Sequence, residues 1–200
     1  MSRLILASTS LSRQSVLRAA GIAFEAVAPG VDEEAVKQAL TTSGAGPRDI
    51  AVALAREKAL AVSRRRRGPV IGADQTLELD GVLFDKPHDM MQARETLRRL
   101  RARRHVLHSA VVVAKDGVVQ WGALVSPQLT MWPFTDRFLE DYLAREGERV
   151  LSSVGAYLIE GPGIQLFEKI DGDHFAILGL PLLPLLNFLR TTQAEEVVEP

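Results

Sequence analysis

Two Asp-Gly pairs, each set among apolar residues, constrain the fold more than any other feature of the sequence. Asp80-Gly81 separates the apolar residues of 77–79 from those of 82–84, and Asp116-Gly117 lies inside the apolar stretch 108–125. Asp-Gly favours the tight turn that joins neighbouring antiparallel strands, so both places predict β-hairpins. A chain with two such hairpins contains antiparallel strand pairs.

Helical patterns stand between the other short apolar runs, which indicates that helical crossovers build part of the sheet. Residues 3–7, 24–28 and 70–73 have the length and composition of buried strands. Apolar residues at helical spacing predict helices before Gly21 and over about 48–64, 89–100, 135–145 and 182–189, with strands and a turn over 156–178. Hairpins and crossovers together predict an α/β protein with a mixed sheet and flanking helices.

Composition excludes several classes of chemistry and partner. The 200 residues contain no cysteine, which excludes thiol catalysis, iron–sulfur clusters and cysteine-based zinc sites. Lys plus Arg (24) nearly balance Asp plus Glu (25), so no overall field attracts nucleic acid or an anionic membrane. The most apolar stretch, 176–189, is shorter than the roughly 20 residues that cross a bilayer. We expect one cytoplasmic domain over 1–200, with an acidic tail at about 191–200 and neither a membrane nor a nucleic-acid partner.

Polar residues follow two of the apolar runs, at places where α/β proteins bind ligands. The segment from Ser8 to Arg13 opens a helix, where free backbone N–H groups, hydroxyls and an arginine suit an anion. Taken alone, an ordinary serine cap explains this segment better. Asp74 follows the run 70–73, where a carboxylate suits a divalent cation or the activation of water; a turn residue explains it equally well.

Three further charged residues could bind a ligand or have a purely structural role. Lys86 follows the first hairpin and suits a phosphate, and Lys58 lies in the helix expected over 48–64, but lysines at such positions are usually surface residues. Glu33 offers a metal carboxylate, although acidic residues at a helix start commonly serve the helix dipole.

Arginine clusters at 64–67 and 98–104 invite a nucleic-acid interpretation. Aromatic residues are not interleaved with them, so solvated basic faces are the better explanation. His105 and His108 lack the helical spacing of a zinc pair and are expected to be structural.

Taken in order, these segments resemble the Maf family of nucleoside triphosphate pyrophosphatases. The matching stretches are LILASTSLSRQSVL (4–17), VDE (31–33), LAREKA (54–59), GADQTLELDGVLFDKP (72–87), the strand at 105–109, and GAYLIEGPGIQLFEKIDGDHFAILGLPL (155–182). They run from Leu4 to Leu182, so the resemblance covers nearly the whole chain.

The resemblance implies hydrolysis of a nucleoside triphosphate between its α and β phosphates, giving a monophosphate and pyrophosphate. It also implies a two-lobed mixed sheet with flanking helices, similar to that of inosine triphosphatases, a central cleft, a homodimer, and dependence on a divalent cation, Mg²⁺ or Mn²⁺. By motif, Asp74 activates water or holds the metal, and Glu33 assists the metal. The phosphate ligands implied by the motifs are Ser8, Arg13, Lys58 and Lys86.

Departures from the family pattern bear on the nucleobase. The family commonly has Ser-Pro-Arg-Arg where this chain has Ser10-Leu11-Ser12-Arg13, Asp-Thr where it has Asp74-Gln75, and Gln-Gly where it has Glu160-Gly161. The last two departures resemble the branch that prefers 7-methyl-GTP rather than the dTTP and UTP branch. The positions expected to set the preference are Ser12, Gln75 and Glu160. An ionised Glu160 only accepts hydrogen bonds, and guanine presents two neighbouring donors.

Other functions stay open at this point. One is a dTTP or UTP pyrophosphatase of the same family. Another is a regulatory protein of cell-division arrest that acts mainly by binding. A nucleic-acid-binding module comes third and rests only on the arginine clusters.

Overall fold

The computed structural model describes residues 3–192, which form two compact units. Within the described chain, the first unit comprises residues 3–75, 108–126 and 173–192, and the second comprises 76–107 and 127–172. That the whole of 1–200 acts as one catalytic domain stays a prediction. The expected acidic tail lies outside the described residues from 193 onward.

The sheet is mixed, as the sequence predicts. Its described strands are β1 (Ile5–Leu6), β2 (Glu25–Ala26), β3 (Val70–Leu79), β4 (Val82–Phe84), β5 (Arg104–Lys115), β6 (Val118–Val125), β7 (Gln128–Met131) and β8 (Phe167–Asp171). Hydrogen-bonded neighbours follow the order β2-β1-β3-β5-β7-β8, with β4 paired to β3 and β6 paired to β5. β1 is parallel to β2 and β3, whereas β3–β4, β5–β6, β5–β7 and β7–β8 are antiparallel.

Helices connect the strands. The described α-helices are α1 (Leu11–Ala19), α2 (Glu33–Thr42), α3 (Pro47–Ser63), α4 (Met90–Leu100), α5 (Asp136–Glu146), α6 (His174–Ile177) and α7 (Leu182–Thr191). Two 3-10 helices, η1 (Gly147–Ser152) and η2 (Pro162–Leu166), lie between α5 and β8. In residues 3–192, no helix is both long and apolar enough to cross a membrane.

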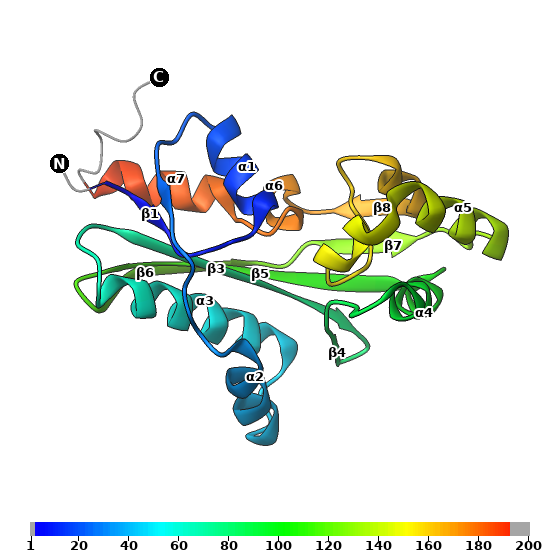
Figure 1. Ribbon diagram of the computed structural model, residues 1–200, viewed down its shortest axis with the longest axis horizontal. Helices are drawn as coiled ribbons and strands as arrows, with labels where there is room; N and C mark the ends of the chain where they lie inside the picture. Colours follow the sequence, from blue (N-terminus) through cyan, green and yellow to red (C-terminus); the bar gives the residue numbers. More distant parts are fainter. Residues whose placement is uncertain (1–2, 193–200) are drawn as a thin grey trace. The chain divides into compact units, whose positions relative to one another are not determined.

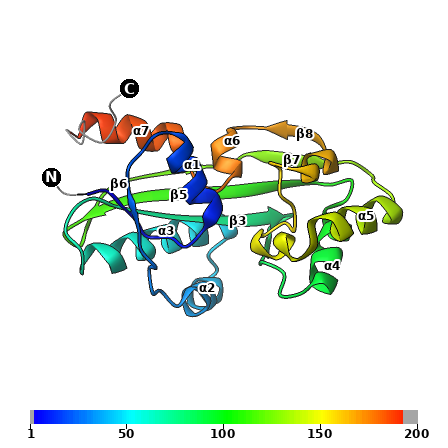
Figure 2. The same ribbon diagram turned by 45° about the horizontal axis from the view of Figure 1, so that its top comes forward.

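In the first unit the two faces of the sheet carry different helices (Figures 1 and 2). α1 and α7 cover one face, where Ile71 of β3 and Val111 of β5 join a large apolar core. α3 covers the other face through a row of small side chains, Ala51, Ala55 and Ala59. Because side chains alternate along a strand, Asp74 shares the α3 face with Gly72, and Gln75 lies on the α1 face.

The second unit encloses its own core, to which α4, α5 and the strands contribute. Its largest fully buried side chains include Leu97, Leu100, Leu107, Leu129 and Met131. His105 lies in this core with Nε2 2.8 Å from the hydroxyl of Tyr157. Burial lowers the pKa of His105 to about 4, so the imidazole is neutral at pH 7.

Three expectations about the elements were wrong. β3 continues to Leu79, so Asp74 lies inside a buried strand rather than after it; an ion pair with α3 makes this carboxylate compatible with the strand. Residues 156–178 contain one strand, β8, with η2 and α6, because Pro162 opens a 3-10 turn where strands were expected. β7 was not predicted, and of α2 only an acidic start at Glu33 was considered; none of the residues of α2 is fully buried.

Gly72 sets how closely α3 approaches β3. A Cβ atom at this position would lie 2.2 Å from the Ala55 carbonyl oxygen and 2.5 Å from the Ala59 nitrogen, both on the backbone of α3. Backbone atoms of a packed helix move only with the whole helix, so no larger residue fits. Lys58 and Asp74 flank this close approach, on α3 and β3 respectively.

We predict that Gly72→Ala lowers the free energy of unfolding by about 2–3 kcal/mol, because the added methyl group pushes α3 away from the sheet. Urea unfolding of the purified protein measures the loss. Gly122→Ala on β6 is the matched control, since its added Cβ would have its nearest neighbours at 3.4 Å. Equal stabilities of the two variants would contradict the packing argument.

Candidate active site

A buried ion pair between α3 and β3 forms the centre of the candidate site. Lys58 Nζ lies 2.6 Å from Asp74 Oδ1, and the two side chains are only 6% and 9% exposed. Lys58 lies three positions after Ala55 and directly before Ala59, so the packing of the alanine row on the sheet also brings the Lys58 ammonium to β3. Lys58 is therefore not a surface lysine, and its role as a phosphate ligand stays a prediction.

Glu33 brings a second carboxylate to the same ammonium. Its Oε1 lies 2.8 Å from Lys58 Nζ, and its side chain is 45% exposed. Glu33 is the first residue of α2, whose N-cap Asp32 accepts a hydrogen bond from the Ala35 amide at 3.0 Å. Glu33 therefore meets Lys58 from the solvent side, while Asp74 meets it from the sheet.

Arg13 lies in the same unit with most of its guanidinium unengaged. Its Nε donates to the Gly179 carbonyl at 2.8 Å, and within residues 3–192 its Nη atoms form no hydrogen bond or ion pair. Burial lowers the pKa of Arg13, while the negative charges of Asp74 and Glu33 raise it in part. A half-buried guanidinium with free N–H groups is suited to a phosphate or carboxylate ligand.

The serines before α1 are arranged as a turn that begins a helix. Ser10, not Ser8, is the N-cap of α1, and its hydroxyl accepts from the Arg13 amide at 3.4 Å. Ser8 is buried and its hydroxyl accepts from the Ser10 amide at 3.2 Å. This turn directly follows β1, the parallel neighbour of β3, and so leads from the sheet to Arg13.

Ser12 and Gln75 hold the backbone between α6 and α7. Ser12 Oγ donates to the Leu178 carbonyl at 2.9 Å, and Gln75 Nε2 lies 2.9 Å from the Ala176 carbonyl and 3.1 Å from that of Ile177. The Arg13–Gly179 hydrogen bond extends this pattern. All four consecutive carbonyls of 176–179 therefore accept hydrogen bonds from side chains of α1 or β3. The expectation that Ser12 and Gln75 contact the nucleobase is untested, and both already have structural partners.

Ser109 is a participant that the sequence analysis missed. Its hydroxyl lies 2.5 Å from the Ala176 carbonyl and 2.7 Å from Gln75 Nε2, and the residue is fully buried. A hydroxyl at the start of the otherwise apolar run 109–114 is the signal that could have identified it.

Lys86 and Glu160 belong to the second unit, whereas Arg13, Glu33, Lys58 and Asp74 belong to the first. Lys86 is exposed and follows β4, and Glu160 is exposed in the turn before η2. Their roles in binding phosphate and base stay predictions. The structure brings together Glu33, Lys58 and Asp74, with Arg13 in the same unit.

Several arginines of the two clusters are engaged within the protein. In the second unit, Arg101 pairs with Asp136 at 2.7 Å, and Arg103 pairs with Asp80. In the first unit, Arg66 pairs with Glu25. These contacts neutralise part of the positive charge of the clusters, and that the protein has no nucleic-acid partner stays a prediction.

The donor set of this cluster suits a hard divalent cation. Among residues 3–192 there is no group of three or more His, Asp or Glu side chains that could enclose a metal by themselves. Mg²⁺ is usually held by one or two carboxylates together with substrate phosphates and water. Asp74 and Glu33, which already converge on one positive charge, provide that number of carboxylates.

Comparison with known proteins identifies the family. The family model for Maf-like protein matches residues 3–192. A nucleoside triphosphate pyrophosphatase of Caulobacter vibrioides is 55% identical over 185 residues, 92% of this chain and 93% of that protein. The 7-methyl-GTP pyrophosphatases of Rhizobium meliloti and Rhizobium johnstonii are 50% and 52% identical, each over 94% of this chain and over 94% and 95% of their own lengths. The chain therefore belongs to the Maf-like protein family.

Proposed function

We propose that this protein hydrolyses a nucleoside triphosphate at the α–β phosphoanhydride, using one water molecule and releasing a nucleoside monophosphate and pyrophosphate. The observation that carries the proposal is the buried Lys58 ammonium shared by Asp74 and Glu33. Relatives at about half identity over most of their length are named for this reaction.

Asp74 is the residue suited to organise the attacking water. Lys58 engages Oδ1, and no residue of the described chain hydrogen-bonds Oδ2. A carboxylate held at one oxygen keeps a fixed orientation, and its second oxygen can accept a proton from water or bind a cation.

Charge balance within the cluster calls for additional cations when a triphosphate binds. Lys58 and Arg13 carry two positive charges, and Asp74 and Glu33 carry two negative ones, so the cluster itself is close to neutral. A triphosphate has about four negative charges, which this cluster alone does not compensate. We propose that Lys86 and a divalent cation, Mg²⁺ or Mn²⁺, supply the remainder.

Asp74 and Glu33 would hold the divalent cation. When bound, such an ion withdraws charge from phosphate oxygens and lowers the pKa of water. The protein's own contribution is to keep the two carboxylates converged and to present the free N–H groups of Arg13 to the phosphates.

The nucleobase assigned by the proposal is a guanine, with 7-methyl-GTP the leading candidate. Relatives named for 7-methyl-GTP and relatives named only as nucleoside triphosphate pyrophosphatases are about equally similar to this chain. The carboxylate of Glu160 favours a base edge with two donors over the uracil or thymine edge, which has one N–H between two carbonyls. This argument supports guanine more firmly than it supports the methyl group.

A panel of triphosphates tests the proposal. GTP, 7-methyl-GTP, dTTP and UTP are incubated with the protein, with and without Mg²⁺ or Mn²⁺, and all phosphorylated products are separated. Monophosphate and pyrophosphate in equal amounts, formed only with the metal, is the expected result. Diphosphate and orthophosphate, or no turnover of any nucleotide, would contradict it.

We predict that Asp74→Asn keeps the fold and lowers the rate of pyrophosphate release by roughly two orders of magnitude or more, because an amide neither accepts the proton nor holds the metal. Asp116→Asn, in the exposed turn between β5 and β6, is the matched control and should retain the wild-type rate. Near-normal turnover by Asp74→Asn would reduce this carboxylate to a structural partner of Lys58.

Glu160→Gln should narrow the preference for guanine-type triphosphates over dTTP and UTP. Loss of a matched polar contact changes discrimination by a factor of about 10 to 150, which corresponds to roughly 1–3 kcal/mol. The ratio of kcat/KM for 7-methyl-GTP and UTP measures the change, with Glu168→Gln on β8, also exposed, as the control. Faster turnover of dTTP or UTP by the wild-type protein would refute the guanine assignment and leave the pyrophosphatase proposal intact.

A further inference from the structure

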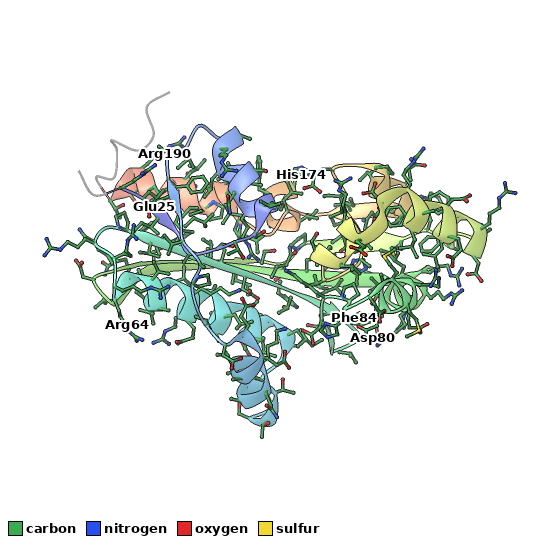
Figure 3. All side chains as sticks on the ribbon, viewed as in Figure 1. Glu25, Arg64, Asp80, Phe84, His174 and Arg190 are labelled. Atoms are coloured by element: carbon green, nitrogen blue, oxygen red, sulfur yellow. The ribbon has the colours of Figure 1, made fainter. Side chains whose placement is uncertain are left out.

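The arginine run that follows α3 divides into two engaged and two unengaged residues. Arg65 donates from Nη2 to the carbonyl oxygens of Ala28 and Pro29, both at 2.8 Å, and Arg66 pairs with Glu25. Within residues 3–192, the side chains of Arg64 and Arg67 form no hydrogen bond or ion pair. Arg64 lies at the C-terminal end of α3 (Figure 3) and is exposed.

The carbonyls that Arg65 binds belong to the segment that leads to Glu33. Upstream, the Val27 amide donates to the Leu6 carbonyl at 2.9 Å, which fastens the segment to β1. Downstream, the N-cap Asp32 begins α2. In between, the hydrogen bonds that reach residues 28–31 within the described chain are those of Arg65.

The chain turns around the Arg65 guanidinium at Gly30. Gly30 has φ +67°, in the left-handed region that glycine adopts without strain, and a Cβ there would lie 3.6 Å from Arg65 Nη1. The guanidinium therefore lies against the turn as well as binding its carbonyls. This contact fixes the direction in which the chain enters α2.

α2 packs against α3, but only through side chains that are at most partly buried. None of its ten residues is fully buried, so no apolar core anchors the helix. The Glu33 side chain in the Glu33–Lys58 ion pair is about half exposed. Exposed ion pairs by themselves contribute little to stability. The segment before α2, which Arg65 binds, therefore contributes to the position of Glu33.

We propose that Arg65 is a positioning residue that sets Glu33 against Lys58 and so helps to form the cation site with Asp74. The expected effect of Arg65 on the rate of hydrolysis rests on the proposed function. Its expected effect on the position of α2 does not. Arg65 touches neither carboxylate, and it acts through the turn at 28–30 and the start of α2.

Arg65→Ala and Arg64→Ala form a matched pair, because the two residues are adjacent, exposed and of the same type. Arg65→Ala should lower kcat about tenfold and raise the Mn²⁺ concentration that gives half-maximal rate, whereas Arg64→Ala should change neither. Arg65→Lys, which can donate to one carbonyl, should be intermediate. Identical behaviour of the two alanine variants would overturn the inference.

A double-variant cycle separates positioning from a general structural effect. If Arg65 acts through Glu33, then Glu33→Gln combined with Arg65→Ala should be no slower, within about twofold, than Glu33→Gln alone. If the rate losses of the two single variants multiply in the double variant, Arg65 acts independently of Glu33, and the inference is overturned.

Hydrogen exchange tests the same inference without turnover. Amides at the start of α2, including that of Ala35, should exchange faster in Arg65→Ala than in Arg64→Ala. If the wild-type protein releases no pyrophosphate from any nucleotide, the proposed function fails while this exchange difference still stands. Unchanged exchange would overturn the positioning role whatever the activity.

Discussion

The buried contact between the ammonium of Lys58 and the carboxylate of Asp74 is the interaction on which the arrangement of the first unit depends. Transfer of each ion out of water costs several kcal/mol, and the mutual attraction of the pair offsets this only at close range. The 2.6 Å separation requires α3 to lie against β3, which the backbone of Gly72 permits and the alanine row of α3 completes. A pair of this kind is weak support for stability and is better explained by chemistry at the same place.

Around this pair, polar side chains bind backbone carbonyls and thereby fix other groups. Arg13 uses Nε for the Gly179 carbonyl, and its Nη atoms have no partner in the described chain. The segment 176–179, whose Gly179 carbonyl accepts from Arg13, is itself bound by side chains of three elements. Gln75 on β3, Ser12 on α1 and Ser109 on β5 donate to the carbonyls of 176–178. A ligand with a high negative charge would meet groups whose positions are set before it arrives, which lowers the reorganisation needed for catalysis.

Local sequence signals predicted the elements that local chemistry determines. Asp80-Gly81 and Asp116-Gly117 do form the two hairpin turns, with both aspartates at positive φ, and Thr135 does cap α5. Asp74 was wrongly placed after its strand, because a charged residue normally ends a buried strand and its partner, Lys58, lies 16 positions earlier in the chain. The extent of α2 beyond its acidic start was not predicted because its position depends on distant contacts, and the carbonyl partners of Gln75 lie about a hundred residues away. The family resemblance supplied what single segments did not, namely that the weak signals at Glu33, Lys58 and Asp74 belong to one site.

The central claim is that the Lys58–Asp74 pair is retained for the reaction rather than for stability. Its most direct test is the double variant Lys58→Met and Asp74→Leu, which replaces both charges with apolar groups of similar length. Urea unfolding and pyrophosphate release are measured on the same preparation. The account predicts a free energy of unfolding equal to or above that of the wild-type protein, since replacing a buried ion pair by apolar side chains is often neutral or stabilising, together with no pyrophosphate release. A double variant that unfolds as easily as Lys58→Met alone, or one that still releases pyrophosphate, would contradict the account.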